Sequence, residues 1–252
     1  MLSSSIILFL RDALPVFVLL AFIVAMLQHQ QERQVRRWFS AAVIALLLLY
    51  LFIQASSRVA QWFHGQGLEV LLLALRACQF GLLYLMLIGW WFRRARLWQY
   101  AAFVLAVITA VMELHDSALY FVAYWQQAPV VVLLGTILGI TVCLAVATLV
   151  HLMMTLLLQQ PDRALVWIPV MLYGTGRLTD ALPLLMQADL LPASPPLWQF
   201  QSLLADETEL GYLLNVLVGY QSSPLAIQVL VYIVALALGL SGLFILKRRG
   251  QP

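Results

Sequence analysis

Eight ionisable residues fall inside long apolar stretches of the chain, where a charge is costly. They are Arg11, Asp12, Arg76, Glu113, His115, Asp116, Arg177 and Asp180. In the hydrocarbon of a membrane each such side chain costs about 3 kcal/mol by insertion scales, and such residues commonly belong to ion or substrate pathways. Carboxylates suit hard cations such as Fe(III), Mg²⁺ and Mn²⁺. The set therefore predicts a site that handles a cation.

Spacing brings these side chains together on helix faces. Glu113 and Asp116 stand at i and i+3, as do Arg177 and Asp180, so each pair shares one face of a helix. Three arginines against four carboxylates leave a charge of minus one with His115 neutral. Such a set can partly neutralise itself and still present oxygen ligands to a cation.

Two other interpretations stay open. Buried arginine–carboxylate pairs can hold helices together without transporting anything, and Arg177 with Asp180 is the pair best suited to that role. His115 can be a hydrogen-bonded core histidine instead of a ligand.

The elements that must carry these residues are membrane-spanning helices. Of the 252 residues 63% are hydrophobic and only 10% are charged, whereas a soluble domain has about 25% charged residues. A membrane helix needs about 20 apolar residues, and lipid offers no hydrogen-bond partner to an open strand. Seven stretches qualify: 6–27, 41–58, 68–92, 97–125, 130–158, 164–187 and 224–246. We expect an all-α polytopic membrane protein with seven transmembrane helices, a single transmembrane domain over 1–252, and an extracytoplasmic loop at 188–223.

Positive charges set the expected orientation, because cytoplasmic connections are enriched in lysine and arginine. One side of the predicted helices has Arg33, Arg36, Arg37, Arg93, Arg94, Arg96, Arg163, Lys247, Arg248 and Arg249. The opposite side has only Arg58. This places the N-terminus outside and the C-terminus in the cytoplasm. The net charge of +3 reflects these rims and predicts no nucleic-acid partner.

This orientation brings the charged residues to similar depths. Arg11 and Asp12 lie roughly 8–9 Å below the outer end of their helix, and Arg76 lies about 12 Å below its own. Residues 113–116 and 177–180 come roughly 20–25 Å from the inner ends of theirs. Four helices therefore place their charges in the outer half of the membrane, which predicts one shared polar site.

The sequence contains no HExxH, GxSxG, P-loop or GxGxxG motif. No nucleophile or cofactor is therefore assigned, and we expect the protein not to be an enzyme. Cys78 and Cys143 both fall inside predicted spans and indicate neither a disulfide nor a CxxC metal site.

A family resemblance is clearest toward the C-terminus. Residues 205–211 (ADETELG) are followed by Gly219-Tyr220-Gln221, by Pro224, and by a last helix that contains VLVY at 229–232. In these features the chain resembles the FTR1 family of iron permeases, which includes fungal high-affinity permeases and bacterial EfeU-type proteins. The resemblance covers nearly the whole chain. It implies seven membrane helices with the N-terminus outside, and Arg-Glu-x-x-Glu motifs on helices one and four that take iron through the membrane.

In the first predicted helix, residues 10–15 (LRDALP) match the motif at Arg11. Asp12 then stands at the first glutamate position. Pro15 stands at the second and has no metal-binding side chain.

In the fourth predicted helix, the continuation 116–127 (DSALYFVAYWQQ) fixes the alignment without a gap. Glu113 and Asp116 take the two glutamate positions, and Met112 replaces the arginine. A shifted alignment that pairs His115 and Asp116 with Arg-Glu loses the second acid. Arg76 and Arg177 are not motif residues and would supply the positive charge that Met112 lacks.

The resemblance implies a permease of the cell (inner) membrane that imports iron through an intramembrane carboxylate site. The expected metal ligands are Asp12, Glu113, Asp116 and His115, and the expected charge-tuning residues are Arg11, Arg76, Arg177 and Asp180. Iron is the transported ion, and no permanently bound cofactor is expected. The expected partners are the lipid bilayer and an extracytoplasmic iron-binding or oxidase protein. The alternative is a divergent member that moves another divalent cation, or a non-conducting membrane subunit for a metal-handling partner.

Overall fold

The computed structural model describes residues 2–29, 35–125, 128–192, 194–202 and 204–248. Arg33 and Arg249, two of the charges used to predict the orientation, lie outside the described residues. The chain divides into two units, Met1–Gln54 with Ala106–Pro161 and Ala55–Leu105 with Asp162–Pro252. The candidate residues at 11–12 and 113–116 therefore lie in the first unit, and those at 76, 177 and 180 lie in the second.

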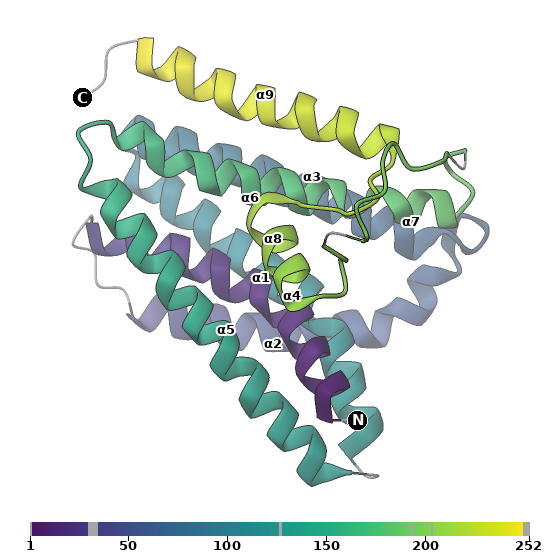
Figure 1. Ribbon diagram of the computed structural model, residues 1–252. Helices are drawn as coiled ribbons and strands as arrows, with labels where there is room; N and C mark the ends of the chain where they lie inside the picture. Colours follow the sequence, from purple (N-terminus) through teal and green to yellow (C-terminus); the bar gives the residue numbers. More distant parts are fainter. Residues whose placement is uncertain (1, 30–34, 126–127, 193, 203, 249–252) are drawn as a thin grey trace. The chain divides into compact units, whose positions relative to one another are not determined.

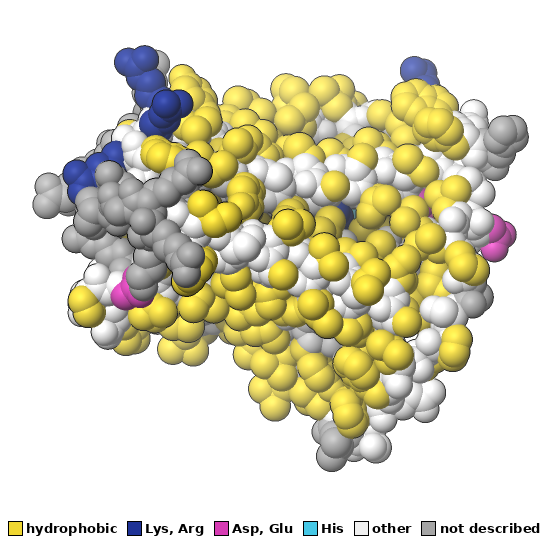
Figure 2. Space-filling view, turned by 90° about the horizontal axis from the view of Figure 1, so that it is seen from above, with side chains coloured by type: hydrophobic (Ala, Val, Ile, Leu, Met, Phe, Trp, Pro, Cys, Tyr) yellow, Lys and Arg dark blue, Asp and Glu magenta, His cyan; other side chains and the backbone are white. Residues whose placement is uncertain are grey.

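Six helices in the described ranges are long and apolar enough to cross a membrane (Figure 1). They are α1 (Leu2–His29), α2 (Val35–Ala60), α3 (Gly67–Trp91), α4 (Ala95–Trp125), α5 (Pro129–Leu158) and α9 (Ala226–Arg248). Hydrophobic side chains also cover much of the face drawn in Figure 2, with few charged side chains among them. Lipid is the solvent that such a surface requires. The prediction of an all-α membrane protein is confirmed to this extent.

In the first unit, α5 packs along α1. The buried residues of α5 recur every three or four positions: Val132, Gly135, Gly139, Cys143, Ala147, Val150, Met154 and Leu158. Glycine, alanine and cysteine in this stripe let two membrane helices approach closely, where dispersion contacts replace the missing hydrophobic drive. On α1, Leu19, Phe22 and Met26 are fully buried. This packing positions the N-terminal half of α1, which carries Arg11 and Asp12.

The sixth expected crossing, 164–187, is not one continuous helix. It consists of η2 (Arg163–Val166), α6 (Trp167–Thr179) and α7 (Leu182–Gln187). Pro183 contributes to the interruption, because its ring nitrogen has no hydrogen to donate to the carbonyl of Thr179 four residues earlier. That carbonyl instead accepts a hydrogen bond from Gln228 Nε2 of α9 at 3.4 Å. Seven crossings and the orientation of the termini stay predictions.

In the second unit, α6 packs against α3, α9 and the ten-residue helix α8 (Glu209–Val218) (Figure 1). Two glycines make this approach feasible. A side chain at Gly174 would overlap Leu83 of α3, and a Cβ at Gly176 would lie 2.6 Å from the Cα of Gly219. Gly219 ends α8 in the left-handed conformation, with φ +71°. The same unit contains η1 (Trp62–Gly65), which precedes α3.

Candidate functional site

Asp12 on α1 is the most buried carboxylate of the predicted site, with 5% of the residue exposed. Its Oδ1 accepts a hydrogen bond from Arg11 Nε at 2.7 Å, and its Oδ2 accepts one from the Ser117 hydroxyl of α4 at 2.8 Å. Both carboxylate oxygens therefore have a donor, one of them charged, as a buried carboxylate requires. The Ser117 contact joins α1 to α4 inside the first unit.

Asp116 on α4 is the second carboxylate held by Arg11. Arg11 Nη2 lies 3.5 Å from Asp116 Oδ2, so a single guanidinium faces the aspartates of both helices. On its other oxygen, Asp116 Oδ1 lies 3.0 Å from His115 Nε2. The His115 ring is oriented by the Met112 carbonyl, 2.9 Å from Nδ1, and by an edge contact with Phe52.

Glu113 lies one helical turn before this pair, on the buried face of α4. Glu113 precedes Asp116 by three residues and Ser117 by four, so the three lie on neighbouring positions of one side of the helix. Ser117 in turn contacts Asp12. Only 8% of Glu113 is exposed. We call Arg11, Asp12, Glu113, His115, Asp116 and Ser117 the α1–α4 cluster.

The α1–α4 cluster is negatively charged overall. Three carboxylates and one guanidinium sum to minus two with His115 neutral, and to minus one with His115 protonated. Both ring nitrogens of His115 face oxygen acceptors, an arrangement that the protonated ring can satisfy from both sides. A surplus of negative charge on two membrane helices attracts a cation in either state.

Among the residues that the structure describes, no group of three or more His, Cys, Asp or Glu side chains is arranged to hold a metal ion. In the α1–α4 cluster, Arg11 lies where the two aspartates approach each other. The assignment of Asp12, Glu113, Asp116 and His115 as metal ligands stays a prediction.

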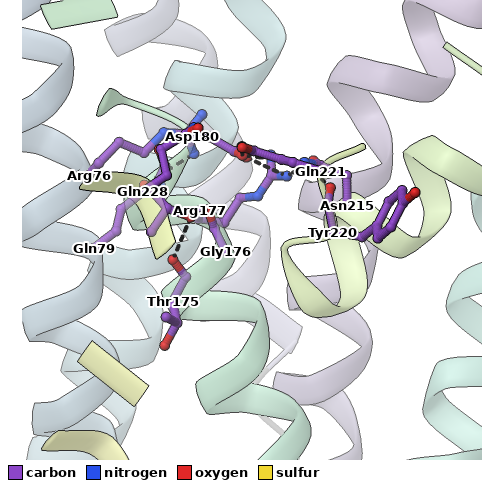
Figure 3. A network of polar contacts seen from close by, with 11 residues as sticks. Arg76, Gln79, Thr175, Gly176, Arg177, Asp180, Asn215, Tyr220, Gln221 and Gln228 are labelled. Carbon is purple, nitrogen blue, oxygen red and sulfur yellow. Dashed lines mark hydrogen bonds and ion pairs between the residues drawn. The ribbon is translucent and has the colours of Figure 1, made fainter. Parts of the chain in front are cut away.

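Arg177 and Asp180, in the second unit, form the ion pair that their i and i+3 spacing predicts. Arg177 Nη2 lies 2.7 Å from Asp180 Oδ2 and donates to Asn215 Oδ1 of α8 as well (Figure 3). The other oxygen of Asp180 accepts hydrogen bonds from Asn215 Nδ2 and Gln221 Nε2, each at 3.3 Å. Only 7% of Arg177 is exposed. This pair is therefore fixed by amides from a different part of the chain.

Arg76 on α3 also belongs to the second unit. It donates to Gln79 Oε1 at 3.4 Å, and Figure 3 shows both side chains beside the network of Arg177 and Asp180. The expectation that Arg76, Arg177 and Asp180 join the residues of α1 and α4 in one site stays a prediction.

Sequence reasoning missed Ser117 and Asn215. Ser117 follows Glu113 by four residues and was detectable as the polar residue on the carboxylate face of that helix. Asn215 is an amide within an otherwise apolar helical stretch, and such a residue in a membrane helix needs a partner.

No family model, curated protein or solved structure matches the chain. The class of protein therefore rests on the fold and the surface alone. Long apolar helices with buried charges define a helical protein compatible with several membrane crossings.

Proposed function

We propose that this protein is a cation permease that imports iron through the α1–α4 cluster. One observation carries the proposal: the buried carboxylate of Asp12 on α1 and the half-exposed carboxylate of Asp116 on α4 share a single guanidinium, that of Arg11. Glu113 adds a third acid one turn away. Burying negative charge in hydrocarbon is expensive, and carboxylates inside membrane helices commonly belong to ion pathways.

The donor chemistry favours a hard cation. The candidate ligands are carboxylate oxygens and an imidazole, which suit iron and manganese, whereas Cu(I) prefers thiolate and thioether sulfur. Cys143, on α5 of the same unit, is buried among apolar side chains. Iron is here the cargo of the protein, not a resident cofactor.

Arg11 is the residue that would respond to the cation. Its side chain is 48% exposed although its guanidinium contacts two carboxylates. An arriving cation can replace the guanidinium between Asp12 and Asp116, because both interactions are electrostatic and need no fixed covalent geometry. Ser117 would hold Asp12 in place during this exchange.

The proposal also draws on the resemblance of the sequence to the FTR1 family of iron permeases. Arg11 and Asp12 match the start of one Arg-Glu-x-x-Glu motif, and Glu113 and Asp116 match the acids of the other. Under this proposal the chain crosses the inner membrane seven times with its N-terminus outside. It performs no covalent chemistry and receives iron from an extracytoplasmic iron-binding or oxidase protein.

A second candidate function is that of a non-conducting membrane subunit for a metal-handling partner, or a carrier of another divalent cation. The observation that favours it is the completeness of the pairing, since Arg11 and His115 already provide donors to Asp116. Pro15 and Met112, which stand where the family has a glutamate and an arginine, favour it as well.

The experiment that separates these functions is metal uptake into proteoliposomes by wild type and Asp12→Asn, with iron, manganese and copper offered separately. We expect wild type to take up iron, and Asp12→Asn to lower the initial rate at least tenfold. Asp189→Asn is the matched control, because Asp189 is exposed and its positive φ of 55° suits asparagine. If folded wild type moves none of the three metals, the non-conducting function holds and the permease proposal is wrong.

A further inference from the structure

The segment between α7 and α9 lies in the second unit and was expected to lie wholly outside the membrane, as a loop over 188–223. Its second half is apolar helix α8, ended by the left-handed Gly219. The turn after α8 reaches α6, since a Cβ at Gly176 would lie 2.6 Å from the Cα of Gly219. The position of this contact along the neighbouring helices gives the depth of the turn.

Two neighbouring helices place the Gly219 turn well inside the apolar region of this unit. Gly174 of α6 contacts Leu83, which lies roughly 24 Å from the first residue of α3 and about 12 Å from the last. Gly176 is about 3 Å from Gly174 along the helix. Measured along the axis of α3, the Gly219 turn therefore lies at least roughly 9 Å from either end of that helix, which is long enough to cross a membrane.

Backbone groups around this turn are bonded to protein groups, as a non-helical segment at membrane depth requires. The amide of Gly219 donates to Asn215 O at 2.8 Å, and the carbonyl of Tyr220 accepts from Asn215 Nδ2 at 3.1 Å. The carbonyl of Val218 accepts from the Tyr232 hydroxyl of α9 at 2.6 Å.

The far side of the turn is held in the same way. The Asp206 carboxylate accepts both from the amide of Ser222 and from its hydroxyl, each at 2.7 Å. The carbonyl of Ser222 accepts from the amide of Phe200 at 2.8 Å, and the amide of Leu225 donates to Gln228 Oε1 at 2.9 Å. These partners satisfy the polar groups of the segment without water, as a non-helical segment at membrane depth requires.

Asn215 connects α8 to the charges of α6. It accepts from Arg177 and donates to Asp180, so the Arg177–Asp180 pair and the amide form a closed triangle (Figure 3). We call Arg177, Asp180 and Asn215 the α6 lock. The interruption of α6 after Thr179 leaves the lock at the end of that helix.

We propose that residues 209–225 form a re-entrant membrane segment and that the α6 lock holds it closed against α6. The segment enters as α8, turns at Gly219 and leaves into α9 on the side from which it came. Its release would expose the interrupted end of α6 to water. This device belongs to the second unit and does not depend on iron passing through the α1–α4 cluster.

The test is labelling of single cysteines by a membrane-impermeant maleimide, in protein with Cys78 and Cys143 replaced by serine and reconstituted in vesicles. Leu217→Cys, on α8, reports the segment, and Ser202→Cys, exposed in the loop, is the accessible reference. We expect Leu217→Cys to react at least tenfold more slowly than Ser202→Cys. Equal rates from the same side would place α8 in water and overturn the re-entrant segment.

The lock is tested by adding Asn215→Ala, which removes the amide of α8 and leaves the Arg177–Asp180 pair intact. We expect labelling of Leu217→Cys to rise at least tenfold while Ser202→Cys is unchanged. Leu210→Ala, an exposed position on the same helix, is the control and should have no effect. Unchanged protection of Leu217→Cys in folded Asn215→Ala would show that the triangle is not the lock. If Asn215→Ala does not fold, the same labelling in Asn215→Leu, which keeps the volume of the side chain and removes both of its contacts to Arg177 and Asp180, decides the point.

Discussion

Arg11→Met destabilises the protein more than the double replacement Arg11→Met/Asp12→Leu. In the single variant the buried carboxylate of Asp12 keeps only the neutral hydroxyl of Ser117 as a donor. Breaking a buried ion pair from one side costs about 3–5 kcal/mol, whereas replacing both partners by apolar groups is often neutral. Because Arg11 is half exposed, we take the lower end of this range.

The measurement is thermal unfolding of the two variants in lipid nanodiscs. For a chain of this size about 1 kcal/mol shifts the melting temperature by about 2–4 °C, so Arg11→Met should melt roughly 6–12 °C below wild type. The double variant should recover at least half of that loss. Arg94→Met, an exposed arginine in the connection before α4, should leave the melting temperature unchanged. Equal losses in the single and double variants would show that Arg11 does not compensate Asp12.

Gly176→Ala is expected to destabilise the second unit although alanine is the better helix former. Its Cβ would lie 2.6 Å from Gly219 Cα and 2.9 Å from Gly219 N, and both are backbone atoms that cannot rotate away. Overpacking of this kind costs about 1–3 kcal/mol. We expect the melting temperature to fall by roughly 5 °C.

Gly81→Ala on α3 is the matched control, because nothing lies within 4 Å of a Cβ at that position. Alanine there should be neutral or stabilising, since glycine in a helix interior costs about 1 kcal/mol relative to alanine. If Gly176→Ala melts like Gly81→Ala, α6 and the Gly219 turn are not in close contact, and the depth assigned to the turn is wrong.

The long helices were predictable because each is an uninterrupted apolar stretch of membrane length, as in α5 and α9. The interruption after Thr179 was not predicted, although Pro183 and Asp180 are visible in the sequence. Proline inside α1 is tolerated in a continuous helix, as Pro15 shows, so proline alone does not determine where a membrane helix stops. The difference lies in tertiary partners such as Gln228, which accommodates the freed carbonyl of Thr179.

The pairings within the α1–α4 cluster were not predictable from spacing. Spacing placed Glu113 and Asp116 on one face, and depth placed Asp12 at a similar height. Neither could show that Ser117 donates to Asp12. In the same way, helical periodicity predicted that Arg177 pairs with Asp180 three residues later. It could not predict the contact of Arg177 with Asn215, because that contact depends on a turn much later in the chain. Rotation of each helix about its axis comes from packing, which local spacing does not contain.

The most direct test of the permease proposal is iron uptake into proteoliposomes by the double variant Glu113→Gln/Asp116→Asn. The reference is Asp189→Asn/Glu207→Gln, which removes the same two charges from exposed positions outside the α1–α4 cluster. The proposal predicts that uptake falls to the level of protein-free vesicles in the first variant and stays at the wild-type rate in the second. Wild-type uptake by a folded, membrane-inserted Glu113→Gln/Asp116→Asn protein would contradict it.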